Sequence, residues 1–290
     1  MDVTNQLTRI FCEMDDFCKN LAQHSAQKLL PDSYKKPRGP RCQLAESEIA
    51  TILVMFHFIR FRDFKTFYVS HVQRYWTSDF PKLPSYNRFI ELIPKAIFYL
   101  ASFILSHQGK QTGLYYIDSS SLPVCHLKRN YRHKTFKSMA SFGKSSVGWF
   151  FGLKIHVVIN HRGELMGLKV TQGSTSDATV AKTLLSRLKG LAFGDKGYLG
   201  KKLFETLLGS GLKLITRKRK NMKPEALTDF EKQALNQRNI IETVFNHLKF
   251  YYQIWHTRHR SISNAFTHLL GSLTAYVLEP LKLSAIKLLS

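Results

Sequence analysis

The chain has 290 residues, 44% of them hydrophobic, and Lys plus Arg outnumber Asp plus Glu by 43 to 20. This length and composition suffice for one good core and a second, smaller helical one, so we expect one or two domains. A formal net charge of +23 is too large for a generic soluble enzyme and favours a polyanionic partner. Nucleic acid is favoured over membrane, because no apolar run of spanning length and no amphipathic helix with a basic face are found.

The first residues show no basic region leading into an apolar segment, so we expect no signal peptide and a cytoplasmic location. The cysteines lack a C-x-x-C spacing and a matching pair of histidines, so we expect reduced, structural thiols and no zinc. They are Cys12, Cys18, Cys42 and Cys125.

Residues 1–110 are predicted to form an all-helical N-terminal domain. Apolar residues recur at helical spacing from Thr4 to Leu30, and prolines and basic residues then indicate a linker. Asp63 and Ser85 are each placed to cap a following helix, and Pro94 should kink or restart the second of these. The short helices are compatible with a DNA-binding helix-turn-helix, and equally with a plain bundle for packing or dimerisation.

From Gly113 onward the apolar pattern changes to that of strands and helices in alternation, and residues 111–290 are predicted to form a second domain. A hairpin is expected at 161–163, and a final apolar helix at 261–278 is assigned to this domain. The element order predicts a mixed five-stranded sheet flanked by helices, which is the order of a ribonuclease-H-like fold. The expected strands are 115–118, 148–160, 164–171, 191–195 and 212–216, and the expected helices are 178–188, 201–208 and about 228–252.

Two carboxylates, Asp118 and Asp195, are predicted to end strands that lie side by side. Two like charges a few ångström apart repel and raise each other's pKa, so such a pair favours a bound cation. Mg²⁺ prefers hard oxygen ligands of this kind. Either residue alone would be an ordinary strand-end turn residue, and the matched placement of both favours a metal site.

A third acid, Glu242, lies on the predicted helix 228–252. At 100° per residue, Arg238, Glu242 and Lys249 fall in one narrow stripe beside an apolar face. In this arrangement Glu242 could bind the metal while Arg238 and Lys249 contact DNA phosphates. It could also be an ordinary solvated i,i+4 pair between Arg238 and Glu242.

Basic residues flank the predicted site in sequence. No acidic residue lies between Asp118 and Glu164, and Tyr131 and Phe136 are interleaved with the basic residues there, which suits phosphate contact with base stacking. A solvated charged loop is the alternative. The candidate DNA contacts in the two basic runs are Lys128, Arg129, Arg132, Lys134, Arg217, Lys218, Arg219 and Lys220.

Two further polar residues receive no catalytic role. Asp177 precedes a predicted helix and is interpreted as its N-cap. His156 lies within a predicted strand, where a core residue is an equal alternative to a functional one.

The motif Arg238-x3-Glu242-x6-Lys249 resembles the Y-x2-R-x3-E-x6-K motif of bacterial insertion-sequence transposases of the DDE type. The segments Tyr-Ile-Asp118-Ser-Ser and Gly-Asp195-Lys-Gly-Tyr complete the acid triad of that family in order. The segments 148–156 and 173–177 are also similar to this group, most closely to insertion-sequence family nine-eight-two. Leu235 stands at the motif's tyrosine position, a departure that bears on DNA contact and not on metal binding.

The resemblance implies a DNA transposase with a ribonuclease-H-like catalytic domain. Asp118, Asp195 and Glu242 would hold two Mg²⁺ ions, for which Mn²⁺ should substitute, and Arg238 and Lys249 would contact DNA. The implied substrates are terminal inverted repeats and target DNA, handled by a dimer or higher oligomer on DNA. The rival functions are a catalytically silent DNA-binding derivative, such as a repressor or domesticated protein, and a structure-specific nuclease of the same fold.

Overall fold

The structure is a computed structural model that describes residues 3–26, 43–145, 147–217, 222, 226–255, 259–282 and 284. The chain divides into two compact units, each described here by itself. The first is Met1–Ser106 with Tyr251–Ile254 and Ser261–Leu278, and the second is His107–Phe250 with Trp255–Arg260 and Glu279–Ser290.

The first unit is helical in all its described elements, as the sequence predicts. Asp63 accepts a hydrogen bond from the Thr66 N–H and begins α3, and Ser85 begins α5 in the same way. Pro94 lies in a short 3₁₀ turn that separates α5 from α6, so both predicted caps and the predicted restart are confirmed. The elements are α1 (Val3–Ala26), α2 (Glu46–Ile59), α3 (Phe64–Phe67), the π-helix η1 (Tyr68–Val72), α4 (Gln73–Tyr75), α5 (Tyr86–Leu92), the 3₁₀ helix η2 (Ile93–Ala96), α6 (Ile97–Ser106) and α11 (Ile262–Leu278).

The core of this unit is built around α2, which is buried along almost its whole length. The rings of Phe56 and Phe64 contact each other and the ring of His268 on α11, with centroids 5.0–5.8 Å apart. The sequence assigned the last helix to the sheet domain, whereas α11 packs against α2 and α6. The apolar residues of α11 predicted a buried helix, but they could not specify which of the two cores the helix joins.

Within the described parts of the chain, one helical stretch, Tyr86–Ser106, is long and apolar enough to cross a membrane when judged by length and composition alone. A single stretch of this kind is weak evidence, because the core helix of a soluble protein passes the same test. Several of its residues, among them Leu92, Ile93 and Phe103, are buried.

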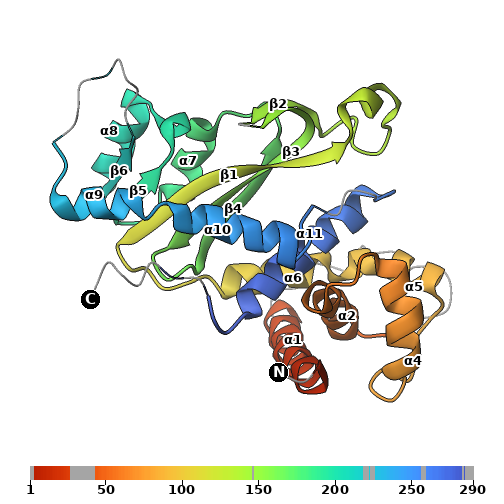
Figure 1. The fold of residues 1–290 in the computed structure, drawn as a ribbon. Coiled ribbons are helices and arrows are strands. Elements are labelled where there is room, and N and C mark those ends of the chain that lie inside the picture. Colours follow the sequence, from red (N-terminus) through yellow and green to blue (C-terminus); the bar gives the residue numbers. More distant parts are fainter. Residues whose placement is uncertain are drawn as a thin grey trace. The chain divides into compact units, whose positions relative to one another are not determined.

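The second unit contains a mixed six-stranded sheet flanked by helices, a ribonuclease-H-like fold (Figure 1). The strand order is β2-β3-β1-β5-β6, with β4 also paired to β3. Pairs among β1 to β4 are antiparallel, and β1–β5 and β5–β6 are parallel. The strands are β1 (Leu114–Cys125), β2 (Ser141–Ser145), β3 (Gly148–Asn160), β4 (Leu165–Gln172), β5 (Gly190–Gly194) and β6 (Leu212–Thr216).

Five of these strands were predicted, and the predicted hairpin between β3 and β4 is confirmed, with Gly163 at φ 74° in its turn. The prediction missed β2, whose sequence Ser-Phe-Gly-Lys-Ser has one apolar residue and no alternation. The strand exists because it completes the edge of β3 beyond the point where β4 stops.

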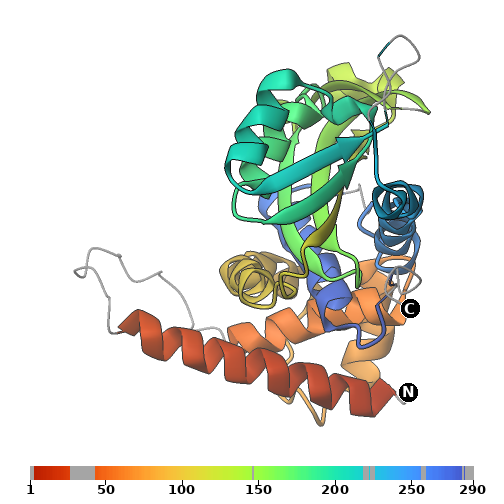
Figure 2. The ribbon, with the colours of Figure 1, turned by 90° about the vertical axis from the view of Figure 1, so that its left-hand side faces the viewer.

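Helices cover the two faces of the sheet (Figure 2). On one face, α7 (Asp177–Leu185) and α8 (Lys201–Gly209) pack on a core that includes Tyr115, Ile117 and Leu214. On the other face, the Tyr116 hydroxyl donates to the Ala234 carbonyl at 3.3 Å, which places α9 (Asp229–Asn236) over β1. Side chains at positions 115 and 116 therefore point to opposite faces, as strand alternation requires.

The predicted continuous helix 228–252 is interrupted. Thr228 caps α9 through a reciprocal pair of hydrogen bonds with Glu231, and a turn at residues 237–238 then separates α9 from α10 (Asn239–Asn246). A π-helical turn, η5 (His247–Tyr251), follows α10. The interruption places Arg238 just before α10, and its side chain faces β1.

Candidate active site

Asp118 lies on β1, and Asp195 directly follows β5, the parallel neighbour of β1. In the register of β1 and β5, Tyr116 pairs with Phe193, and the two rings are 5.6 Å apart between centroids. Two residues after these positions come Asp118, within β1, and Asp195, the first residue after β5. The two carboxylates are close enough for the charge of Asp195 to raise the pKa of Asp118.

The sequence predicted that the first strand ends at Asp118, and this prediction is wrong. Pairing with β5 stops near this position, but β1 continues to Cys125 against the long strand β3. The three serines at 119–121 were interpreted as a turn, and they are strand residues because β3 supplies hydrogen-bonding partners as far as Phe151. Asp118 therefore sits inside β1 at the edge left open where β5 finishes.

Arg238 joins Asp118 to Glu242. Its Nη1 lies 3.2 Å from Asp118 Oδ2, and its Nη2 lies 2.6 Å from Glu242 Oε1. The expected i,i+4 pair is present, but the guanidinium is only 14% exposed and also reaches β1, so a purely solvated surface pair is excluded. Glu242 itself is 51% exposed.

The pKa of Asp118 is raised to about 6. Burial is the largest cause, since the side chain is only 20% exposed and water stabilises its charge poorly. The Ser119 N–H, which donates to Oδ1 at 2.8 Å, and the Arg238 guanidinium oppose this rise. The charges of Asp195 and Glu242 add to the rise, so the predicted repulsion exists but is secondary to burial.

The chemistry of the three acids suits Mg²⁺, which prefers carboxylate oxygens. Among the described residues, however, no three His, Cys, Asp or Glu side chains converge closely enough to hold a metal ion. Asp195 is exposed at the end of β5, and the Arg238 guanidinium places a positive charge between Asp118 and Glu242. The oxygen donors are therefore of the type that Mg²⁺ prefers, but they do not converge in this structure, in which Arg238 pairs with two of the three carboxylates.

Lys249 lies on η5, beyond Glu242. Burial lowers the pKa of its ammonium, and the carboxylate of Asp118 acts in the opposite direction. The ammonium also lies 4.5 Å from the centroid of the Trp255 ring. The structure therefore joins Arg238 to both Glu242 and Asp118, whereas Lys249 is linked to Asp118 only through the effect of its charge.

The first basic run forms a short 3₁₀ helix, η3 (Leu127–Arg132), and the residues after it. Lys128, Arg129, Arg132 and Lys134 are exposed. Tyr131 is 72% exposed, whereas Phe136 is buried and stacks on His133, so Phe136 is a core residue and not a base-stacking one. In the second run Arg217 is exposed after β6, and Lys218, Arg219 and Lys220 lie outside the described residues.

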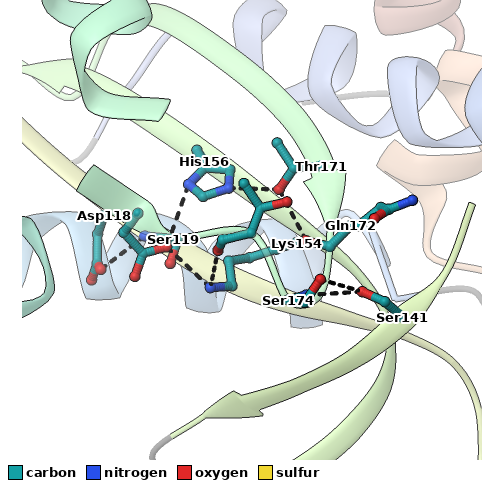
Figure 3. Close-up of polar contacts among 10 residues, drawn as sticks. Asp118, Ser119, Ser141, Lys154, His156, Thr171, Gln172 and Ser174 are labelled. Atoms are coloured by element: carbon teal, nitrogen blue, oxygen red, sulfur yellow. Dashed lines mark hydrogen bonds and ion pairs between the residues drawn. The ribbon is translucent and has the colours of Figure 1, made fainter. Parts of the chain in front are cut away.

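A polar cluster that the sequence did not predict includes Lys154, His156 and Thr171 (Figure 3), and Asp177 belongs to it. The N-cap of α7 is Ser176, so Asp177 is the first helical residue and the predicted N-cap is wrong. Its carboxylate accepts a hydrogen bond from Lys154 Nζ at 3.1 Å and lies 3.6 Å from His156 Nδ1. Alternation along β3 places residues 154 and 156 on one face, which is the only signal that could have indicated this cluster.

His156 is fully buried on β3, as the core interpretation predicted. Its Nε2 lies 2.9 Å from Thr171 Oγ1, and burial lowers its pKa to about 4. It is therefore neutral at physiological pH and supplies packing and a hydrogen bond.

A family model described as "Transposase DDE domain" matches residues 108–262, more than half of the chain. The matched range includes all three acids and the basic run on η3. The comparison with curated proteins found no match.

Proposed function

Because the chain belongs to the transposase DDE-domain family, we propose that it cuts the DNA at the ends of an insertion sequence and joins those ends to target DNA. The observation that carries the proposal is the pairing of β1 with β5, which sets Asp118 beside Asp195, together with Arg238, whose guanidinium contacts both Asp118 and Glu242. Insertion-sequence family nine-eight-two is the proposed subgroup, on the motif segments described above.

In this proposal Asp118, Asp195 and Glu242 hold two Mg²⁺ ions, or Mn²⁺ in their place. When bound, the ions supply an activated water or 3′-hydroxyl and stabilise the leaving 3′-oxygen. Arg238 keeps Asp118 and Glu242 together before the ions bind and then becomes available to a DNA phosphate. The buried setting of Asp118 makes its negative charge costly without a cation and therefore favours metal binding.

The basic residues are proposed to hold the DNA backbone. Exposed cations on η3 and Arg217 belong to the same unit as the acids, and the charge of the chain provides long-range attraction. The helical N-terminal unit would add DNA binding or dimerisation, since two ends must be brought together. A dimer or higher oligomer on DNA in the bacterial cytoplasm is proposed accordingly.

Two rival functions make different predictions. A structure-specific nuclease of the same fold would cut DNA without joining it to a second molecule, and a silent derivative would bind without cutting. The retained acid triad favours an enzyme over the silent derivative.

The experiment is cleavage of a labelled element-end duplex by the purified protein, with Mg²⁺, with Mn²⁺ and with EDTA. Asp118→Asn should abolish cutting and leave DNA binding nearly intact. Glu205→Gln is the matched control, because Glu205 is an exposed acid on α8, a helix that packs on the opposite face of the sheet. Metal-dependent cutting followed by joining to a second DNA supports the proposal, whereas tight binding with no cutting under any condition contradicts it.

A further inference from the structure

Two large aromatic rings are exposed just beyond the helix that carries Glu242. Phe250 is 68% exposed and Trp255 is 39% exposed. Their ring centroids are 6.1 Å apart with an interplanar angle of 67°, so the two rings form an edge-to-face pair. Such a pair presents adjoining apolar surface to solvent, and contiguous exposed apolar surface is a feature of binding sites.

Trp255 is fixed to the strand that carries Asp118. Its indole N–H donates to the Ser121 carbonyl at 2.9 Å, and Ser121 lies three residues beyond Asp118 on β1. The Lys249 ammonium is 4.5 Å from the centroid of the indole ring. Trp255 is therefore held by a hydrogen bond and a cation–π contact, while Phe250 remains the more open ring.

The same lysine adjoins the rings and is influenced by Asp118. Lys249 is partly buried, its ammonium lies beside the indole ring, and the charge of Asp118 acts to raise its pKa. The rings are thus accompanied by a cation and anchored through Trp255 to β1, three residues beyond Asp118. A cation beside an aromatic surface is the combination that binds a phosphate together with an unstacked base.

We propose that Phe250 and Trp255 form a stacking platform for one unpaired base of the DNA, adjacent to the phosphate that is cut. Phe250 supplies the open face, Trp255 supports it, and Lys249 takes a phosphate of the same strand. This inference deepens the proposed function and rests on it. A DNA partner is favoured over a protein partner because Lys249 adjoins the rings and the chain as a whole is strongly basic.

The test uses element-end duplexes that carry 2-aminopurine at the terminal nucleotide, either paired or left unpaired, with the full-length protein in EDTA so that no cutting occurs. We expect the wild-type protein to quench the unpaired probe by stacking. Phe250→Ala should lose the quenching and bind the unpaired duplex about tenfold less tightly, with little change for the paired duplex. Leu208→Ala removes a comparably exposed apolar side chain from α8 and should behave as wild type.

Two further variants separate stacking from simple apolar contact. Phe250→Trp keeps an aromatic face and should retain the quenching, and Phe250→Leu keeps apolar volume without a π-face and should lose it. Wild-type quenching in Phe250→Ala or Phe250→Leu would overturn the platform. If such a result accompanies Mg²⁺-dependent cutting that Asp118→Asn lacks, the platform fails and the proposed function stands. A wild-type protein that neither binds nor cuts the DNA would overturn both.

Discussion

Replacing Asp118 by Asn should stabilise the metal-free protein at neutral and alkaline pH. The carboxyl pKa is about 6 in the folded chain against an ordinary value of 3.8, so folding makes ionisation harder. At about 1.4 kcal/mol for each pKa unit, the ionised carboxylate costs the folded state about 3 kcal/mol at pH 8. Asn has nearly the same shape, and its amide oxygen can accept from the Ser119 N–H as Oδ1 does.

The sign of the pH dependence follows from proton linkage. Between pH 4 and pH 6 the folded protein binds more protons at this carboxyl than the unfolded chain does, so the stability of the wild type falls as pH rises. The penalty is absent well below pH 4, reaches about half its full size at pH 5, and is fully present above pH 6. The excess in free energy of unfolding of Asp118→Asn over the wild type should therefore grow by about 1.4 kcal/mol between pH 5 and pH 8.

Urea denaturation of both proteins in EDTA, at pH 5 and at pH 8, measures this difference. The variant should show a higher midpoint at pH 8 and a smaller advantage at pH 5, and Mg²⁺ should reduce the advantage because only the wild type binds it well. A variant less stable than the wild type at pH 8, or an advantage that does not change with pH, would refute the reasoning about burial.

Three further predictions concern the fold. Gly152→Ala should lower the free energy of unfolding by about 1–3 kcal/mol in urea denaturation, because its Cβ would clash with the backbone oxygen of Leu122. An unchanged midpoint would contradict the β1–β3 register. Thr228→Ala should cost about 1 kcal/mol, since it removes the side-chain acceptor that begins α9, and Thr228→Ser should restore it. In thiol labelling at pH 8, the exposed Cys12 should react in the native protein and Cys18 only after unfolding. Cys18 is buried, and its pKa is raised to about 11. Equal labelling rates for the two thiols would contradict the packing of α1.

The local pattern of apolar residues was enough to predict the sheet and the positions of Asp118 and Asp195. Both acids directly follow short apolar stretches, and strand alternation fixes the face on which they lie. The pattern failed where a strand depends on its neighbour. The polar end of β1 and all of β2 are strands because β3 is long enough to pair with both.

Contacts between distant residues were beyond the reach of sequence patterns. Arg238 and Asp118 are 120 positions apart, and the helical spacing showed only the pair with Glu242. Lys154 and Asp177 likewise meet because the first turn of α7 lies against β3. No local sequence signal specifies that packing. The assignment of α11 failed for a related reason, since an apolar helix predicts burial without naming its partner.

The central claim is that Asp118, Asp195 and Glu242 hold metal ions together, and iron-directed backbone cleavage tests it most directly. Fe²⁺ with ascorbate and peroxide would replace Mg²⁺ and cut the chain next to bound metal. The account predicts cuts near all three acids that excess Mg²⁺ suppresses and that Asp118→Asn removes, with Glu205→Gln unchanged. Cuts confined to other segments, or cuts at the three acids that persist in Asp118→Asn, would contradict it.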